Sequence, residues 1–400
     1  MSPRRRAAVV GVAESALGRT PEHTVLTQQA TAAGAALAEA GLGRDDVDAL
    51  FVAGGWSWSP AVVLSEYLGL RPAYLDGTNI GGSSFEAHVG HATAAIEAGL
   101  IDVALITYGS TQRSDRSRMA PRPATLTEQF ERPFGLPQPV GAYALAATRY
   151  LHEYGARPEQ LAEVAVSARR WAALNPKAFH REPLTVDDVL ASPMICEPLH
   201  KLDCCLVTDG GGAIVVAAED RWADVATRPV VVLGHAETTT HNSITNMPDL
   251  TVTGAARSGP AAMGMAGVGH DDLDVLEIYD SFTITVLLTL ESLGFCKPGE
   301  AGDFVDGGRT APGGALPMNT NGGGLSYTHP GMYGIFLLIE ATRQLRHDYH
   351  SGDHGDHGDH DDHDTAPAGG QRQVSGAELA LVHGTGGVLS STSTVVLGRS

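Results

Sequence analysis

Two successive series of short apolar segments, separated by segments with helical spacing, constrain how this chain can fold. In the first series, residues 7–13, 48–55 and 101–109 have the apolar character of buried strands. Helical spacing occupies residues 24–40, and a second helix is expected to end near Ala98. This alternation predicts an α/β fold with mostly parallel strands.

The second series begins near residue 228 and repeats the order of the first. Its expected strands are 228–237, 275–280, 378–387 and 393–398, and its expected helices are 281–295 and 334–346. We therefore expect an N-terminal half formed by residues 1–225 and a C-terminal half formed by residues 226–400. The pattern loosens between about residues 112 and 200, which predicts a loop region inserted over the active site.

The composition of the chain is that of a globular enzyme and excludes several classes of partner. Hydrophobic residues make up 43% and charged residues 18% of the 400 residues, which indicates a large buried interior. The net charge of −19 argues against nucleic acid or an anionic membrane as the main partner. No apolar run approaches the roughly 20 residues that a membrane-spanning helix needs, and the N-terminus lacks the apolar core of a signal peptide.

The cysteines indicate a reducing compartment. The chain has four of them, and their spacing fits neither a disulfide framework nor a zinc site. We therefore expect reduced thiols and a cytoplasmic protein.

A segment rich in His and Asp, residues 347–370, interrupts the second half. Its first eighteen residues carry no Lys or Arg, and its low complexity predicts a surface insertion. Neutral His and Asp can ligate Zn or Ni, so a metal role remains an alternative. A low-complexity composition is a weak signal, and we assign no metal site.

Four glycine-rich or polar segments lie where predicted strands and helices meet. They read NIGGSSF at 79–85, EIYDSF at 277–282, NTNGGGLSYTHPGMYG at 319–334, and HGTGG at 383–387. Glycine clusters allow tight turns and close approach of the backbone to a ligand. The start of a helix after the first segment also offers backbone N–H groups to an anion.

These four segments resemble the active-site loops of the thiolase superfamily. Residues 319–334 resemble the NGG…GHPxGxSG loop, whose histidine helps hold the thioester oxygen of an acyl-CoA in that family. Residues 277–282 are similar to the family's NEAF or HDxF segment, with Tyr279 in the place of its polar residue. The chain looks like a member of the sterol-carrier or lipid-transfer branch, and the resemblance implies a five-layer α/β/α/β/α fold of two duplicated halves.

The two cysteines that a thiolase needs have no counterpart in this chain. Gly82 or Ser83 stands where the attacking cysteine would be, and His383 stands where the second cysteine would be. In residues 319–334 the loop after Pro330 is one residue shorter than the family's usual loop. The resemblance to the steroid side-chain-cleaving aldolases of this superfamily therefore implies a retro-aldol cleavage that forms no acyl-enzyme.

The resemblance and the chemistry of the side chains together predict a set of site residues. One of Tyr279 and Tyr327 is expected to take the hydroxyl proton of the substrate while the other polarises the thioester carbonyl. His329 and His383 are expected to be supporting donors, although a structural role for His383 is an equal alternative. The expected substrate-binding residues are Gly82, Ser83, Ser84, Asn321, Gly323, Tyr333 and Gly386.

The predicted reaction converts a 17-hydroxy steroid that carries a short CoA-thioester side chain into a 17-ketosteroid and propionyl-CoA. The resemblance further implies a DUF35-type partner with an OB fold and a zinc ribbon, a homodimeric core, and no cofactor beyond the substrate's own CoA. Three alternatives stay open. They are a thiolase with Ser83 or Ser84 as nucleophile, a thiolase-like acyltransferase subunit, and a scaffold that binds acyl-CoA without catalysis.

Overall fold

The computed structural model describes residues 5–115, 125–349 and 372–400. Most of the His- and Asp-rich insertion therefore lies outside the described residues. The first half contributes five strands, which are β1 (Ala7–Glu14), β2 (Ala49–Val52), β3 (Tyr74–Asp76), β4 (Val103–Ser110) and β7 (Gly210–Ala218). The second half contributes β8 (Val230–Thr239), β9 (Val275–Ile278), β10 (Leu379–Gly386) and β11 (Ser391–Arg399).

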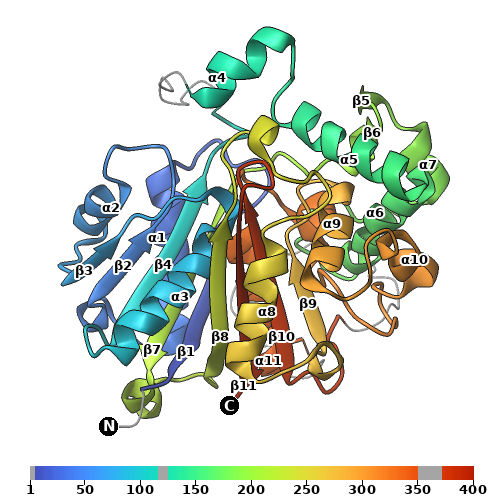
Figure 1. Cartoon of the computed structure of the whole chain (residues 1–400). Helices are drawn as coiled ribbons and strands as arrows, with labels where there is room; N and C mark the ends of the chain where they lie inside the picture. The colour runs from blue at the N-terminus through green and yellow to red at the C-terminus, as the bar shows by residue number, and fades with distance from the viewer. Residues whose placement is uncertain (1–4, 116–124, 350–371) are drawn as a thin grey trace, which may run out of the picture.

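These nine strands form one sheet in the order β3-β2-β4-β7-β1-β8-β11-β10-β9 (Figure 1). The two groups meet only where β1 pairs with β8 through Ala8 and Val9. The order of the second group mirrors that of the first, because β8, β9, β10 and β11 correspond to β1, β2, β4 and β7. In the first half, the short strand β3 pairs in parallel with β2. At the corresponding place in the second half, Met318 forms a single parallel bridge with Leu276 of β9. The topology is therefore that of two duplicated halves, while the boundary at residue 225 stays a prediction.

Six helices complete the layers around the two groups of strands. They are α1 (Val25–Ala40), α2 (Pro60–Leu68), α3 (Ser84–Glu97), α8 (Ala255–Ala266), α9 (Thr283–Leu293) and α11 (Gly334–Arg346). The first two cover the outer face of the first group, and α8 covers β8 and β11 on the outer face of the second. Between them, α3 and α11 contact each other and strands of both groups. This arrangement gives the five layers that the sequence predicted.

The middle-layer helices are buried on nearly all sides, which explains their composition. Of α11, the residues from Gly334 to Thr342 are all buried. A helix that is enclosed by two groups of strands needs apolar or small side chains around its whole circumference. In contrast, α1 exposes one face and begins at the capping residue Thr24, whose side chain accepts a hydrogen bond from the backbone N–H of Thr27.

The strand directions differ from the prediction of a mostly parallel sheet. Only the pairs β2–β3, β2–β4 and β9–β10 are parallel, and the other five pairings are antiparallel. The prediction was wrong because the last strand of each half returns beside its predecessor. A short turn joins β10 to β11, and a short turn can join only antiparallel neighbours.

The region between β4 and β7 is largely helical. It contains α4 (Leu126–Phe130), α5 (Val140–Tyr154), α6 (Pro158–Ala173), α7 (Val186–Ala191) and the hairpin of β5 (Met194–Cys196) and β6 (Leu199–His200). In Figure 1 α5 and α6 lie beside α9 and α10 (Ala301–Val305), whereas α4 lies apart at the top of the view. The hydroxyl of Tyr150 donates to the carboxylate of Glu291 on α9, so the inserted region is anchored to the second half.

Membrane insertion of a helix finds no support in the fold. None of the helices in the described parts of the chain combines the length and the apolar character that crossing a bilayer requires.

Candidate active site

The turn that precedes α3 packs directly against Tyr279. Gly82 lies in the short 3-10 turn Gly81–Ser83, and a Cβ atom at Gly82 would lie 2.2 Å from Cε2 of Tyr279. It would also lie 2.6 Å from the carbonyl oxygen of Thr385. Real Cβ atoms do not approach other atoms so closely, so the contact between this turn and the tyrosine ring requires glycine.

The HGTGG segment packs against the same turn. A Cβ at Gly386 would lie 1.6 Å from the carbonyl oxygen of Ile80, and one at Gly81 would lie 2.6 Å from the backbone nitrogen of Gly387. Backbone therefore packs on backbone here. Three of the four segments that the sequence singled out converge at the N-terminus of α3.

Tyr279 connects these loops to the fourth segment through a hydrogen-bonded cluster. Its hydroxyl lies 3.0 Å from Nε2 of His329 and accepts a hydrogen bond of 3.1 Å from the backbone N–H of Tyr333. The rings of Tyr279 and His329 are nearly perpendicular at a centroid distance of 5.7 Å. The structure thus brings together three of the predicted site residues.

Burial favours the neutral forms of Tyr279 and His329. It raises the pKa of Tyr279 well above its ordinary value, and it lowers the pKa of His329 to about 4. At neutral pH the pair is a neutral phenol beside a neutral imidazole. The phenol can donate one proton, and the imidazole can accept one.

The NTNGGG segment is held by carboxylate and amide side chains. The carboxylate of Asp280 accepts hydrogen bonds from the backbone N–H groups of Gly324, at 2.6 Å, and Leu325, at 3.2 Å. Asn319 accepts a bond of 2.8 Å from the N–H of Ile278. Burial raises the pKa of Asp280 to about 7, although the two N–H groups oppose this shift. Asp280 therefore positions the loop that carries His329.

The predicted binding residues Asn321 and Gly323 belong to the frame of this loop. Asn321 accepts hydrogen bonds from the hydroxyl of Tyr333, at 2.7 Å, and from the N–H of Gly323, at 2.9 Å. Gly323 has a positive φ of 67°, and a Cβ there would lie 2.0 Å from Oδ2 of Asp280. These contacts orient Tyr333, whose N–H bonds to Tyr279.

Tyr327 lies outside the cluster around Tyr279. Its hydroxyl donates to Oε1 of Glu14, and burial followed by the charge of Glu14 raises its pKa well above the ordinary value. Glu14 is also paired with Lys177 at 2.8 Å. Because this partner fixes the hydroxyl, we revise the sequence-based assignment and leave Tyr327 out of the proposed catalytic set.

His383 also points away from the cluster. Its Nδ1 lies 2.9 Å from the hydroxyl of Thr394, which in turn lies 3.0 Å from Ser258 on α8. Its neighbour Gly384 faces the other side of the sheet, toward α3. Since successive strand residues face opposite sides, His383 faces the outer layer. We therefore assign it the structural role that the sequence left as an equal alternative.

The serines at the start of α3 lack a base. The hydroxyl of Ser83 donates to the carbonyl of Ile80 at 3.0 Å, and that of Ser84 donates to the carbonyl of Gly81 at 2.7 Å. The histidines His88 and His91 bind Thr78 and Asp76 instead. A serine nucleophile needs an adjacent base, so this geometry speaks against a covalent serine mechanism.

The sequence did not indicate several residues that complete the site. The hydroxyl of Tyr108 donates to the carbonyl of Pro330 at 2.6 Å and accepts from the N–H of Met332 at 3.2 Å, so it shapes the turn after His329. Tyr143 on α5 donates to the carbonyl of Gly387 at 3.2 Å. A tyrosine at a strand end or on an amphipathic helix is usually a packing residue, so the sequence offered no reason to assign Tyr108 or Tyr143 to the site.

The low pKa of His329 leads to a prediction for the pH dependence of activity. An ordinary histidine would become protonated near pH 6.5, but His329 is expected to stay neutral down to about pH 4. The acidic limb of the kcat/KM profile should therefore lie well below pH 6. Between pH 6.5 and about 4, His329 is protonated in the unfolded chain but neutral in the folded chain. The free energy of unfolding therefore decreases as the pH falls through this range. Stopped assays between pH 4.5 and 8, with folding checked by circular dichroism, measure this, and a limb near 6.5 would contradict the assignment.

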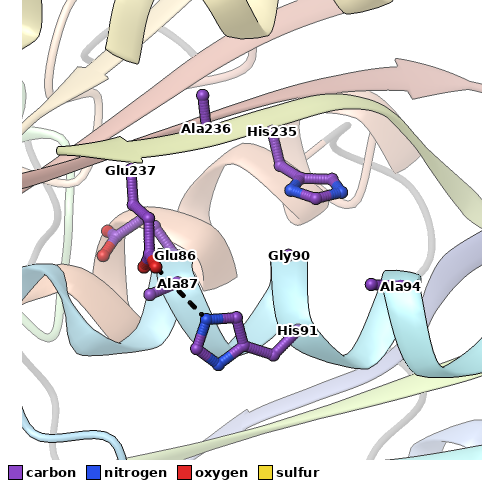
Figure 2. A pocket seen from close by; sticks show the side chains of 8 residues that line it. All are labelled: Glu86, Ala87, Gly90, His91, Ala94, His235, Ala236 and Glu237. Atoms are coloured by element: carbon purple, nitrogen blue, oxygen red, sulfur yellow. Dashed lines mark hydrogen bonds and ion pairs between the residues drawn. The ribbon is translucent and has the colours of Figure 1, made fainter.

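A pocket of about 210 Å³ lies between α3 and β8. Figure 2 shows that α3 provides one wall and β8 the other, and that the side chains of His235 and Glu237 extend from β8 toward α3. His91 bridges Asp76, at 2.8 Å, and Glu237, at 3.4 Å. No group of three or more potential metal ligands occurs in the described parts of the chain.

Comparison with known proteins identifies the family to which this fold and site belong. Residues 236–356 match the family described as "Thiolase C-terminal domain-like". The chain is 34% identical to the 17-hydroxy-3-oxo-4-pregnene-20-carboxyl-CoA lyase of Mycobacterium tuberculosis, with 85% of this chain and 92% of that protein aligned. It is also 34% identical to the steroid side-chain-cleaving aldolase of Thermomonospora curvata, with 85% and 90% aligned. A solved structure, the Ltp2-ChsH2(DUF35) aldolase, superposes with a TM-score of 0.85 at 29% identity over 98% of both chains.

The layered fold and the converging loops are those of a thiolase-like enzyme. The chain belongs to the thiolase superfamily, in the group of the steroid side-chain-cleaving aldolases.

Proposed function

We propose that this enzyme is an aldolase that cleaves a carbon–carbon bond in the side chain of a steroid CoA thioester. The substrate is a 17-hydroxy steroid with a β-hydroxyacyl-CoA side chain, and the products are a 17-ketosteroid and propionyl-CoA. The observation that supports this best is the hydrogen-bonded pair of Tyr279 and His329, packed on a turn that has glycine where a thiolase has its nucleophile. The two relatives that are 34% identical to this chain carry names of this kind of activity.

The thiols of the chain do not offer a replacement nucleophile. All four cysteines are unpaired, and burial raises the pKa of Cys204 to about 12 and that of Cys205 further. A thiolate is the reactive form of cysteine. The site therefore favours a reaction that forms no acyl-enzyme, and a retro-aldol cleavage has that property.

The proposed mechanism begins at the substrate hydroxyl. Tyr279 accepts the hydroxyl proton while it passes its own proton to Nε2 of His329. The carbon–carbon bond then breaks and leaves a ketone and the enolate of the thioester. Backbone N–H groups at the N-terminus of α3 are the donors that we assign to the enolate oxygen, and one such donor contributes roughly 3–4 kcal/mol. Protonation of the α-carbon completes the reaction.

A DUF35-type partner is part of the proposal. The solved aldolase of similar fold is named as a complex of this kind. Coenzyme A is anionic and this chain has a net charge of −19, so a second protein that supplies positive charge fits the substrate. We further propose a homodimeric core, no cofactor beyond the substrate's CoA, and a cytoplasmic location, which the unpaired thiols support.

The test is an assay of the purified chain with and without a co-expressed DUF35-type protein. The substrate is a 17-hydroxy steroid with a propionyl-CoA side chain, and the products are followed by mass spectrometry. We expect the 17-ketone and propionyl-CoA in equal amounts. Retained acyl-CoA binding without any cleavage in the presence of the partner would favour the non-catalytic scaffold instead.

A further inference from the structure

The carboxyl group of Glu86 has no hydrogen-bond partner although it is almost fully buried. The described residues contain eight buried Asp and Glu side chains, and Glu86 alone has neither oxygen in a hydrogen bond. The others all have partners, as Asp280 and Glu291 illustrate. An unsatisfied buried carboxyl costs stability, so its presence requires an explanation.

The carboxyl lies at the junction of the segments that form the site. Glu86 is in the first turn of α3. A Cβ at Gly384 would lie 2.2 Å from its Oε2, and one at Gly334 would lie 2.6 Å from both oxygens. Gly384 belongs to the HGTGG segment, and Gly334 directly follows Tyr333. Glycine at both positions makes room for the carboxyl, and no side chain at either one covers it.

Glu86 also lines the pocket between α3 and β8. The groups that face it there are His91 on α3 and His235 and Glu237 on β8 (Figure 2). Glu237 is exposed and His91 is half-buried, so the pocket that Glu86 helps to line opens toward the surface. Glu86 thus borders both the catalytic loops and a pocket that opens toward the surface.

We infer that Glu86 is the acid that protonates the enolate in the proposed retro-aldol reaction, an inference that rests on the proposed function. In this step the O–H bond of the Glu86 carboxyl breaks and a C–H bond forms at the α-carbon of the thioester. The resulting carboxylate regains its proton from the imidazolium of His329, which received it from the substrate hydroxyl through Tyr279. The proton count is balanced, and no further reactant is consumed.

The protonation state of Glu86 agrees with this role. Burial raises the pKa of its carboxyl to about 8, so the group carries a proton at neutral pH. The pKa of His329 is lowered to about 4, so return of the proton from the imidazolium to the carboxylate is downhill. The tyrosines of the site hold their protons more tightly, because burial raises their pKa values.

The test uses exchange of the α-protons of propionyl-CoA in D2O, in the chain with its DUF35-type partner. In this exchange the carboxylate of Glu86 removes an α-proton, the carboxyl group exchanges that proton with solvent, and a deuteron returns to the α-carbon, so the assay reports the proposed step in both directions and requires no steroid. We expect Glu86→Gln to slow the exchange 10²- to 10⁴-fold. Glu86→Asp, which keeps an acid but shortens it, should retain more activity than Glu86→Gln. A packing role predicts the reverse order, because Gln preserves the volume and Asp does not.

Controls separate the inference from the proposed function. Glu66→Gln makes the same carboxyl-to-amide change at an exposed position of α2 and should leave exchange unchanged, while thermal melting and CoA-thioester binding show that each variant is folded. If the wild type cleaves the steroid and Glu86→Gln exchanges at the wild-type rate, the inference is overturned and the function stands. If the wild type exchanges without cleaving and Glu86→Gln loses exchange, the function fails and the role of Glu86 stands. A wild type that neither cleaves nor exchanges overturns both.

Discussion

Replacement of Tyr279 by phenylalanine is expected to lower kcat for steroid cleavage by 10²- to 10⁴-fold, with a smaller change in KM. The variant removes the hydroxyl that lies 3.0 Å from His329 and that accepts the N–H of Tyr333. General acid–base assistance of this kind contributes about two to four orders of magnitude. The buried N–H of Tyr333 also loses its acceptor, so a stability loss of about 1–3 kcal/mol is expected.

Steady-state kinetics of Tyr279→Phe and urea denaturation measure the two effects separately. Tyr327→Phe is the matched control, because Tyr327 is equally buried but its hydroxyl binds Glu14. It should lose stability and retain most of its kcat. Near wild-type kcat in Tyr279→Phe, or an equal loss of kcat in both variants, would remove Tyr279 from its special role.

Replacement of Gly82 by alanine is expected to lower kcat by about 10²-fold. The new methyl group would lie 2.2 Å from the ring of Tyr279 and 2.6 Å from the carbonyl oxygen of Thr385. The ring must move away from His329, and a displacement of about 1 Å at a catalytic group costs rates of this order. Overpacking of this kind also costs about 1–3 kcal/mol of stability.

Gly34→Ala provides the matched control for the glycine substitution. Gly34 lies on the exposed face of α1, and nothing lies within 4 Å of a Cβ built there. This variant should gain about 0.5–1 kcal/mol because alanine favours the helix, and its kcat should not change. Thermal melting measures the stability of both variants, and steady-state kinetics measure their kcat values. A Gly82→Ala enzyme with wild-type kcat would contradict the described contact.

Local patterns in the sequence were sufficient for most elements of the fold. The helix at 334–346 has the bounds that its spacing predicted, and α1 ends at Ala40 as predicted but begins one residue later, at Val25. The duplication was visible because the same order of strands and helices occurs twice. In contrast, α8 was missed, since its small residues and the internal Pro260 give no clear apolar face. Strand directions depend on pairing between distant segments, which periodicity does not reveal.

The candidate site could be predicted as a set of segments but not as a geometry. The four motif segments do converge, and Tyr279, His329 and Tyr333 form one hydrogen-bonded cluster. The direction of a side chain within a segment depends on its partner elsewhere. Tyr327 turns to Glu14, 313 residues away in the chain, and no local pattern encodes such a pair.

The proposed role of Glu86 also could not be predicted from the sequence. In the sequence it is an ordinary acidic residue in the first turn of a helix, where a negative charge is favourable. Only the three-dimensional arrangement shows that its oxygens have no partner and that Gly334 and Gly384 border them.

The measurement that tests the central claim most directly is the consumption of free CoA during cleavage of the steroid thioester. A thiolytic reaction transfers an acyl group to CoA and needs one CoA for each bond that is cleaved. A retro-aldol reaction at Tyr279 and His329 needs none. We predict full cleavage to the 17-ketone and propionyl-CoA in the absence of added CoA, with no covalent adduct in the intact-protein mass spectrum. A strict requirement for one equivalent of CoA, together with an acylated protein, would contradict the account.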